Sequence, residues 1–173
     1  MEWMWMPLKR YADFSGRSRR MEFWMWVVFQ VLIFFVFIIL VIALGGAMVM
    51  SGDIRGGMAM GGIILILYLL YSVMQLAFLV PGLAVTIRRL HDTNRSGWWI
   101  LVAVIPYAIL GFMMARSATS TDMSGQASVG LFGIIALIGG VVLLVFMILA
   151  GTAGDNRYGP DPYAGGTASS ATG

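Results

Sequence analysis

Long apolar blocks alternate with short polar segments along this chain. The four blocks, residues 23–50, 61–86, 98–114 and 129–150, contain no Asp, Glu, Lys, Arg or His. A helix needs roughly 20 apolar residues, with a range of about 17–25, to cross a bilayer. Strands of membrane barrels alternate apolar and polar residues, and the apolar run over residues 31–36 does not. The pattern predicts an all-α, polytopic membrane protein, a four-helix bundle with spans at about 23–44, 61–86, 98–114 and 129–150.

The polar segments divide the chain into three parts. Residues 1–22 form an N-terminal segment, in which residues 2–11 are expected to lie along the membrane surface as a short interfacial helix. Residues 23–150 form the transmembrane domain. Residues 151–173 form a tail that we expect to be disordered from about residue 165, where only Gly, Ala, Ser and Thr remain. A cleaved signal peptide is disfavoured, because its apolar core would be only about 7–15 residues long.

The composition excludes two other classes of protein. Of the 173 residues, 60% are hydrophobic and 11% are charged, whereas a soluble domain has about 25% charged residues. A soluble globular protein is therefore excluded, and the high apolar content excludes a disordered one. Cysteine is absent, so the chain has no disulfide, thiolate metal site or cysteine nucleophile.

The basic residues are distributed unevenly between the two sides of the predicted bundle. Residues 1–22, 87–97 and 151–173 would share one side, and together they carry nine Lys and Arg. The other two loops carry two, Arg55 and Arg116. Short cytoplasmic loops are enriched in Lys and Arg, so both termini are predicted to be cytoplasmic.

A few residues within the spans break the apolar pattern. Pro81 and Pro106 are expected to kink their helices, because proline removes a backbone donor and crowds the preceding turn. Such kinks arise from ordinary packing or mark a hinge or cavity lining. The polar side chains within the spans are expected to face other helices; they are Gln30, Ser72 and Gln75. Ala136 and Gly140 have the spacing of a close helix–helix contact.

Three polar motifs lie on the predicted cytoplasmic side. They are FSGRSRRMEFW at residues 14–24, RRLHDTNRSGWW at 88–99 and GDNRYGPDP at 154–162. Together they resemble the domain-of-unknown-function 805 family, a family of small bacterial inner-membrane proteins, and the resemblance covers about residues 8–162. It implies a multi-pass protein of the bacterial inner (cytoplasmic) membrane with cytoplasmic motifs, and it implies no biochemical activity.

The arginines of the first two motifs suggest an anion site. An unpaired helix N-terminus favours an anion, and the arginine fork suits phosphate. One hypothesis is therefore that an anionic lipid headgroup binds at these arginines. The alternative is that they enforce orientation and pair with Glu22, Asp13 or Asp92, with Arg88 and Arg89 at helical spacings from Asp92. The candidate headgroup residues are Arg17, Arg19, Arg20, Arg88 and Arg89.

The remaining polar residues predict a network rather than an active site. Adjacent His91 and Asp92 would point in different directions on a helix, so catalysis is disfavoured, and a single histidine without an acid cluster disfavours a metal site. The tail motif is typical of tight turns, and we expect it to dock on the other two motifs, with Arg157 reaching a carboxylate. The expected network contains Glu22, His91, Asp92, Asn156, Arg157 and Asp161.

Three functions remain open at this point. The first is a non-enzymatic scaffold or lipid-headgroup-binding module, with membrane lipids as partners and a second copy or another membrane protein as a further partner. The second is a small oligomeric channel or transporter that uses the proline kinks, although no ionisable residue lies at membrane depth. The third is a lipid-modifying enzyme that uses His91 and Asp92. No cofactor or nucleic-acid partner is expected, because membrane anchoring explains the basic and aromatic residues.

Overall fold

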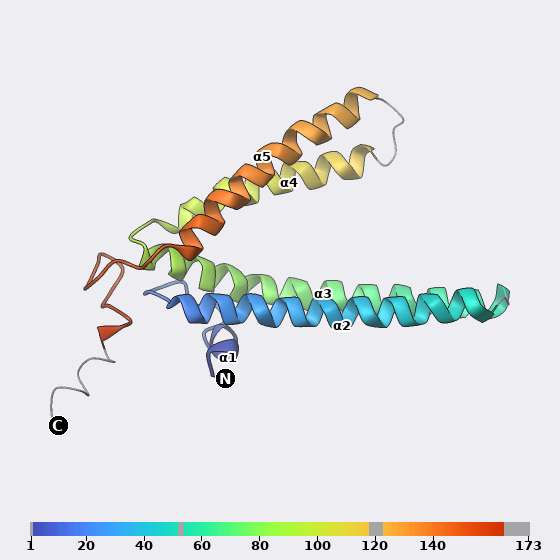
Figure 1. Ribbon diagram of the computed structural model, residues 1–173, viewed down its shortest axis with the longest axis horizontal. Coiled ribbons are helices and arrows are strands. Elements are labelled where there is room, and N and C mark those ends of the chain that lie inside the picture. Colours follow the sequence, from blue (N-terminus) through green and yellow to red (C-terminus); the bar gives the residue numbers. More distant parts are fainter. Residues whose placement is uncertain (1, 52–53, 118–122, 165–173) are drawn as a thin grey trace. The chain divides into compact units, whose positions relative to one another are not determined.

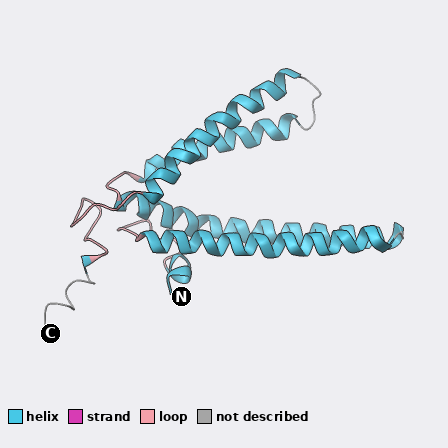
Figure 2. Ribbon diagram, viewed as in Figure 1, coloured by secondary structure: helices cyan, strands magenta, loops and turns pink. Residues whose placement is uncertain are grey.

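Every regular element in the described chain is a helix (Figures 1 and 2). The structure is a computed structural model that describes residues 2–51, 54–117 and 123–164; the tail expected to be disordered from about residue 165 lies outside these residues. The elements are α1 (Glu2–Lys9), α2 (Arg20–Ser51), α3 (Ile54–Asp92), the 3-10 helix η1 (Gly97–Ile100), α4 (Leu101–Ser117) and α5 (Met123–Ile148).

Four of the helical stretches are long and apolar enough to cross a membrane, which confirms the fold class. They are Arg20–Gly46, Met60–Asp92, Gly97–Ser117 and Ser128–Ile148. Several begin earlier or end later than the spans expected from hydropathy. Backbone hydrogen bonding continues into polar residues at a helix end, whereas hydropathy marks only the part that hydrocarbon can cover. Thus α2 runs through Gly45 and Gly46 and ends at Ser51.

The chain forms two compact units, which we describe separately. The first contains Met1–Asp13 and Trp24–Ala84, and the second contains Phe14–Phe23 and Val85–Gly173. Residues 14–23 of the first polar motif therefore belong to the same unit as the end of α3 and the tail.

In the first unit, aromatic side chains join the antiparallel helices α2 and α3. The Trp26 and Phe78 rings meet edge to face at 5.6 Å, and Phe37 stacks on Tyr71 at 4.2 Å. Helix α1 packs on α2 through an edge-to-face contact of Trp5 with Phe29 at 5.2 Å. Such pairs add about 0.5–1.5 kcal/mol each beyond the area they bury.

The polar side chains within these two spans have partners at short range. Gln30 Nε2 donates to Gln75 Oε1 at 3.4 Å, which confirms the expectation that these two residues face another helix. The Nε2 of Gln75 also donates to the Tyr71 hydroxyl at 3.0 Å. Ser72 differs, since its hydroxyl donates to the Tyr68 carbonyl one turn earlier in its own helix.

The two membrane spans that contain proline, α3 and α4, are unbroken helices. Helix α3 continues through Pro81, whose side chain is fully buried, and α4 continues through Pro106. Neither proline ends a helix, and a bend at each stays a prediction.

In the second unit, α4 and α5 pack closely along a row of small residues. Ala103 and Ala136 are buried at the contact, and a methyl group at Gly140 would lie 2.9 Å from the Tyr107 hydroxyl. The close approach predicted from Ala136 and Gly140 is confirmed. Lipid offers no hydrophobic drive for this contact, so small residues that admit dense packing hold the pair together.

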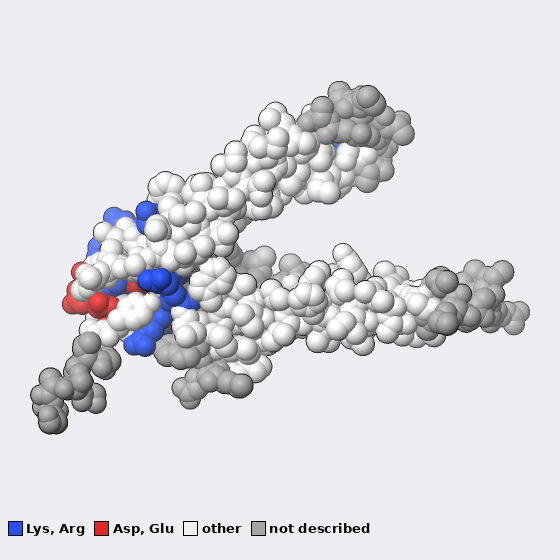
Figure 3. Space-filling view, in the orientation of Figure 1, with Lys and Arg blue, Asp and Glu red and all other residues white. Residues whose placement is uncertain are grey.

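The outer surfaces of the spans are apolar, as contact with lipid requires. The exposed fraction is 67% for Ile42 and 68% for Leu76. In Figure 3 the charged side chains gather around the polar loops, and the helix surfaces in that view are almost entirely white.

Candidate functional site: a buried polar cluster at the helix ends

The end of α3 is shaped by a left-handed residue. Asn94 has φ of 57°, and asparagine tolerates this conformation better than most side chains. The Asn94 amide donates to the His91 carbonyl at 3.0 Å, and the Arg95 amide donates to the Leu90 carbonyl at 2.9 Å. This pair of bonds is a Schellman motif, which ends the helix and leaves Asp92 in its last turn.

Asp92 is the centre of a buried group of charges. The Nε of Arg17 donates to Asp92 Oδ1 at 3.0 Å, and the Nη1 of Arg89 donates to Asp92 Oδ2. The side chains are at most 1% exposed. A buried carboxylate of this kind is stable only when it is paired and hydrogen-bonded. Both oxygens of Asp92 are therefore used within the protein.

A second buried ion pair joins α2 to α3. The Nη2 of Arg88 donates to Glu22 Oε1 at 2.5 Å, and these side chains are 0% and 4% exposed. Glu22 lies in the first turn of α2, where the helix dipole also favours a carboxylate. We call Arg17, Glu22, Arg88, Arg89 and Asp92 the polar cluster.

The tail motif satisfies carbonyls at the end of α3. The Thr152 amide donates to the Asp92 carbonyl at 2.8 Å, and Asn156 Nδ2 donates to the His91 carbonyl at 3.0 Å. Arg17 extends the contact by donating to the carbonyls of Thr152 and Gly154, each at 2.6 Å. The last carbonyls of a helix have no partner within it, so the docked tail replaces water at this end.

The carbonyls at the end of α5 also have hydrogen-bond donors from outside the helix, in this case from an arginine. Arg89 donates to the carbonyls of Met147 and Leu149. Cations at a helix C-terminus complement its negative dipole end. Arg89 therefore joins the ends of α3 and α5 while it pairs with Asp92.

Arg19 and Arg20 lie outside the polar cluster. Arg19 is half-buried, donates to the Pro162 carbonyl and has its guanidinium 5.3 Å from the centre of the Tyr163 ring. The Arg20 side chain is exposed, and its Nη1 donates to the Ile148 carbonyl at 3.4 Å. Among the arginines of the first motif, these two are the ones that solvent or lipid can reach.

His91 is held by stacking and one backbone contact. Its ring lies 3.8 Å from the Tyr158 ring at an angle of 4°, and Nδ1 is 3.2 Å from the Gly16 carbonyl. Gly16 has φ of 76°, a left-handed turn that glycine adopts without strain. The histidine therefore connects the first and third motifs.

Arg157 and Asp161 of the tail motif have backbone partners. Arg157 Nη2 donates to the Asn94 carbonyl at 3.1 Å, and its guanidinium lies over Tyr158. The expectation that Arg157 reaches a carboxylate is wrong, because its guanidinium donates instead to the Asn94 carbonyl, just after the end of α3. Asp161 accepts from the Gly154 amide at 3.0 Å and from the Tyr163 amide at 2.9 Å.

The Asp161 turn predicts a pH dependence of tail docking. Hydrogen bonds from the backbone amides of Tyr163 and Gly154 lower the pKa of Asp161, and the charges of Arg17 and Arg19 add to this effect. Since the folded pKa lies below the unfolded one, the carboxylate stabilises the docked tail above the ordinary carboxyl pKa. That contribution is lost as the pH falls through the folded pKa.

We expect the NMR amide shifts of Gly154 and Tyr163 to titrate with a midpoint below the ordinary carboxyl value. The Asp161→Asn variant should lose this titration, and Asp13→Asn should keep it. A wild-type midpoint at or above the ordinary value would contradict the assignment.

The structure thus brings all three motifs together at one set of helix ends, as expected for the tail. Among the predicted pairs, Arg89–Asp92 forms, whereas Arg88 pairs with Glu22 instead of Asp92. Sequence reasoning missed Gly151 and Thr152. A methyl group at Gly151 would overlap the Asp92 carboxylate, so a Gly-Thr pair after the last span was the available signal.

The charged side chains of this site are arranged as ion pairs. Among the residues that the structure describes, no group of three or more His, Asp and Glu could hold a metal ion. The carboxylates of the polar cluster are each held by arginine. What the cluster can do is fix the ends of α2, α3 and α5 relative to the tail.

The three polar motifs lie almost wholly within a region that matches a known protein family. The family model described as "Protein of unknown function (DUF805)" matches residues 11–160, which include the first two motifs and most of the third. The chain belongs to the DUF805 family. It is 35% identical to the inner membrane protein YhaH of Escherichia coli (strain K12) over 162 residues, 94% of this chain and 97% of YhaH.

Two further relatives from the same organism support membership in DUF805. The inner membrane protein YhaI is 33% identical over 165 residues, 95% of this chain and 98% of YhaI. The uncharacterized protein YiiR is 28% identical over 149 residues, 86% of this chain and 85% of YiiR. No solved structure matches the chain. This DUF805 member is a multi-pass protein of the bacterial inner membrane.

Proposed function

We propose that this protein is a non-enzymatic membrane scaffold that binds anionic lipid headgroups through Arg19 and Arg20. The observation that supports the scaffold is the double pairing of Asp92 with Arg17 and Arg89. Charges that are buried and saturated by one another hold a structure in one arrangement, and they offer nothing to a substrate. In this proposal the polar cluster holds the ends of α2, α3 and α5 in one fixed arrangement.

The proposed headgroup site contains two of the five arginines expected from the sequence. Arg17, Arg88 and Arg89 have side chains that are 0–1% exposed, so a phosphate at the membrane surface cannot reach them. Arg19 and Arg20 remain accessible, and an arginine near an anionic membrane surface contributes about 1 kcal/mol to binding.

The same contacts argue against acid–base catalysis by His91 and Asp92. A general base needs its lone pair within reach of a substrate proton. Both oxygens of Asp92 accept hydrogen bonds from arginine, and His91 is stacked against Tyr158. These contacts support the non-enzymatic part of the proposal.

Replacing Arg19 and Arg20 together by glutamine tests headgroup binding. We expect the affinity for phosphatidylglycerol to fall by up to about 2 kcal/mol, which is roughly thirtyfold. Native mass spectrometry of the detergent-extracted protein, titrated with phosphatidylglycerol and with phosphatidylcholine, measures the change. It also reports the number of subunits.

The matched control is Arg116→Gln, in the last turn of α4 and therefore at the end of that span far from the three polar motifs. This variant should leave the affinities for phosphatidylglycerol and for phosphatidylcholine unchanged. Equal binding of phosphatidylglycerol by the wild type and the double variant would contradict headgroup binding. Ion or solute flux through liposomes that contain the purified protein would contradict the scaffold and favour the small channel or transporter.

A further inference from the structure

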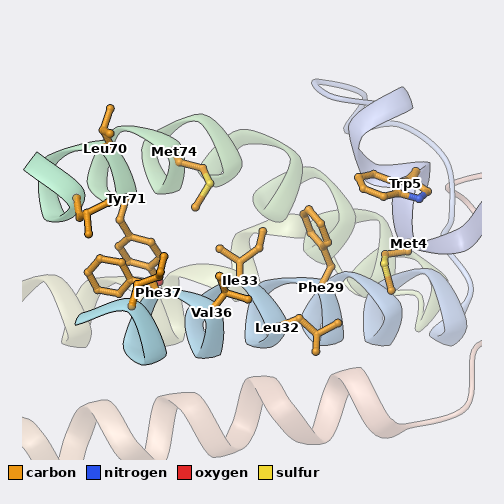
Figure 4. Close-up of a pocket in the computed structure, with 12 residues that line it drawn as sticks. Met4, Trp5, Phe29, Leu32, Ile33, Val36, Phe37, Leu70, Tyr71 and Met74 are labelled. Atoms are coloured by element: carbon orange, nitrogen blue, oxygen red, sulfur yellow. The ribbon is translucent and has the colours of Figure 1, made fainter. Parts of the chain in front are cut away.

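An apolar groove runs along the first unit. Its volume is about 480 Å³, and α1, α2 and α3 each contribute to its walls. Figure 4 shows Met4 and Trp5 of α1 at one end and the stacked pair of Phe37 and Tyr71 toward the other, with Ile33 between them. The volume falls within the roughly 300–1,000 Å³ of typical small-molecule sites.

The length of the groove matches the depth of one lipid leaflet. Its wall on α2 extends from Phe29 to Leu40, which is about 16 Å at 1.5 Å per residue. The hydrocarbon core of a bilayer is about 30 Å thick, so one leaflet contributes about 15 Å. A transmembrane helix is about 10–12 Å wide with its side chains, which is too wide for a groove of about 480 Å³ at this length. A straight acyl chain is therefore the better fit.

The α1 end of the groove has the features of a membrane interface. Trp5 lines the groove, and its four-residue spacing from Lys9 puts both side chains on one face of α1. Lys9 is exposed, and a lysine stem can follow apolar surface while its ammonium group stays at the headgroups. An aromatic ring beside a lysine is the usual arrangement at this depth.

We propose that the groove binds one acyl chain of a membrane glycerophospholipid, whose phosphate lies at Lys9. The chain would enter beside Trp5 and end near the stacked rings of Phe37 and Tyr71. This site lies wholly within the first unit, and none of its residues belongs to the polar cluster or to the Arg19 and Arg20 headgroup site. It therefore extends the proposed function and does not depend on it.

Filling the groove tests the proposal. Val36 lines the groove and is 59% exposed, whereas Val31 on the same helix is 44% exposed and does not line it. The test is made in the variant with both Arg19 and Arg20 replaced by glutamine, so that the headgroup site does not contribute. We expect this variant, once delipidated, to retain one added palmitoyl-oleoyl-phosphatidylglycerol per chain in native mass spectrometry, and the further substitutions are compared in this background. Val36→Trp should lose this adduct, Val31→Trp should keep it, and Lys9→Gln should weaken it several-fold.

Three results would overturn the acyl-chain site. The first is equal retention of the lipid by Val36→Trp and Val31→Trp, and the second is no retained lipid in the variant with only Arg19 and Arg20 replaced. The third is a wild-type dimer that Val36→Trp dissociates, because a second copy would then cover the groove. The variant with both Arg19 and Arg20 replaced by glutamine should keep the groove adduct, which separates this test from that of the proposed function.

Discussion

Replacing Asp92 by alanine is expected to destabilise this protein more than any other single change in its polar segments. The substitution leaves Arg17 and Arg89 buried without their carboxylate. Removing one partner of a buried ion pair typically costs about 3–5 kcal/mol, because the remaining charge has lost its compensation. The free energy of unfolding, measured by titration with sodium dodecyl sulfate and circular dichroism, should fall by about this amount.

The control is an exposed ion pair in the same chain. Asp13 pairs with Arg10 at 2.6 Å, and these side chains are 37% and 35% exposed. Surface pairs of this kind contribute about 0–1 kcal/mol, so Asp13→Ala should change the unfolding free energy little. Similar losses for the two alanine variants would contradict the assigned role of Asp92.

A further variant separates charge from packing. Replacing Arg17, Arg89 and Asp92 together by Met, Met and Leu removes the charges and keeps much of the volume. Buried ion pairs replaced by apolar side chains often lose no stability. We expect the triple variant to recover most of the stability that Asp92→Ala loses, although the carbonyls that Arg89 satisfies at the end of α5 would lose their donor.

The parts of the fold that depend on local pattern could be predicted from the sequence. Four apolar blocks gave the number of spans, since each block alone decides whether a helix can enter hydrocarbon. The Arg89–Asp92 pair also followed from a three-residue spacing on one helix. Turn residues in the tail motif indicated a compact segment that could dock.

Contacts between distant residues could not be predicted in this way. Arg17 and Asp92 are 75 residues apart, and Arg88 and Glu22 are 66 apart, so their pairing depends on how the helix ends meet. Hydrogen bonds to backbone carbonyls are still harder to predict from the sequence, because every residue has a carbonyl. The partners of Arg89 and Arg157 are such carbonyls, and nothing in the side-chain sequence distinguishes them.

The second largest effect is expected at Gly139, in the contact between α4 and α5. A methyl group there would overlap the carbonyl oxygen of Val102, which is backbone and cannot rotate away. Gly139→Ala must therefore push the two helices apart, and overpacking of this kind costs about 1–3 kcal/mol. Gly133→Ala in the same helix is the control, because a methyl group there meets nothing within 4 Å.

The two glycine variants should differ in geometry as well as in stability. The chain contains no cysteine, so spin labels can be attached at cysteines introduced at exposed Ile105 of α4 and Ile138 of α5. Pulsed electron paramagnetic resonance should give a longer or broader label separation for Gly139→Ala than for the parent, and an unchanged one for Gly133→Ala. Because alanine favours a helix over glycine by about 1 kcal/mol, Gly133→Ala should even gain stability. A similar gain for Gly139→Ala would mean that the backbone approach at Val102 does not hold these two spans together.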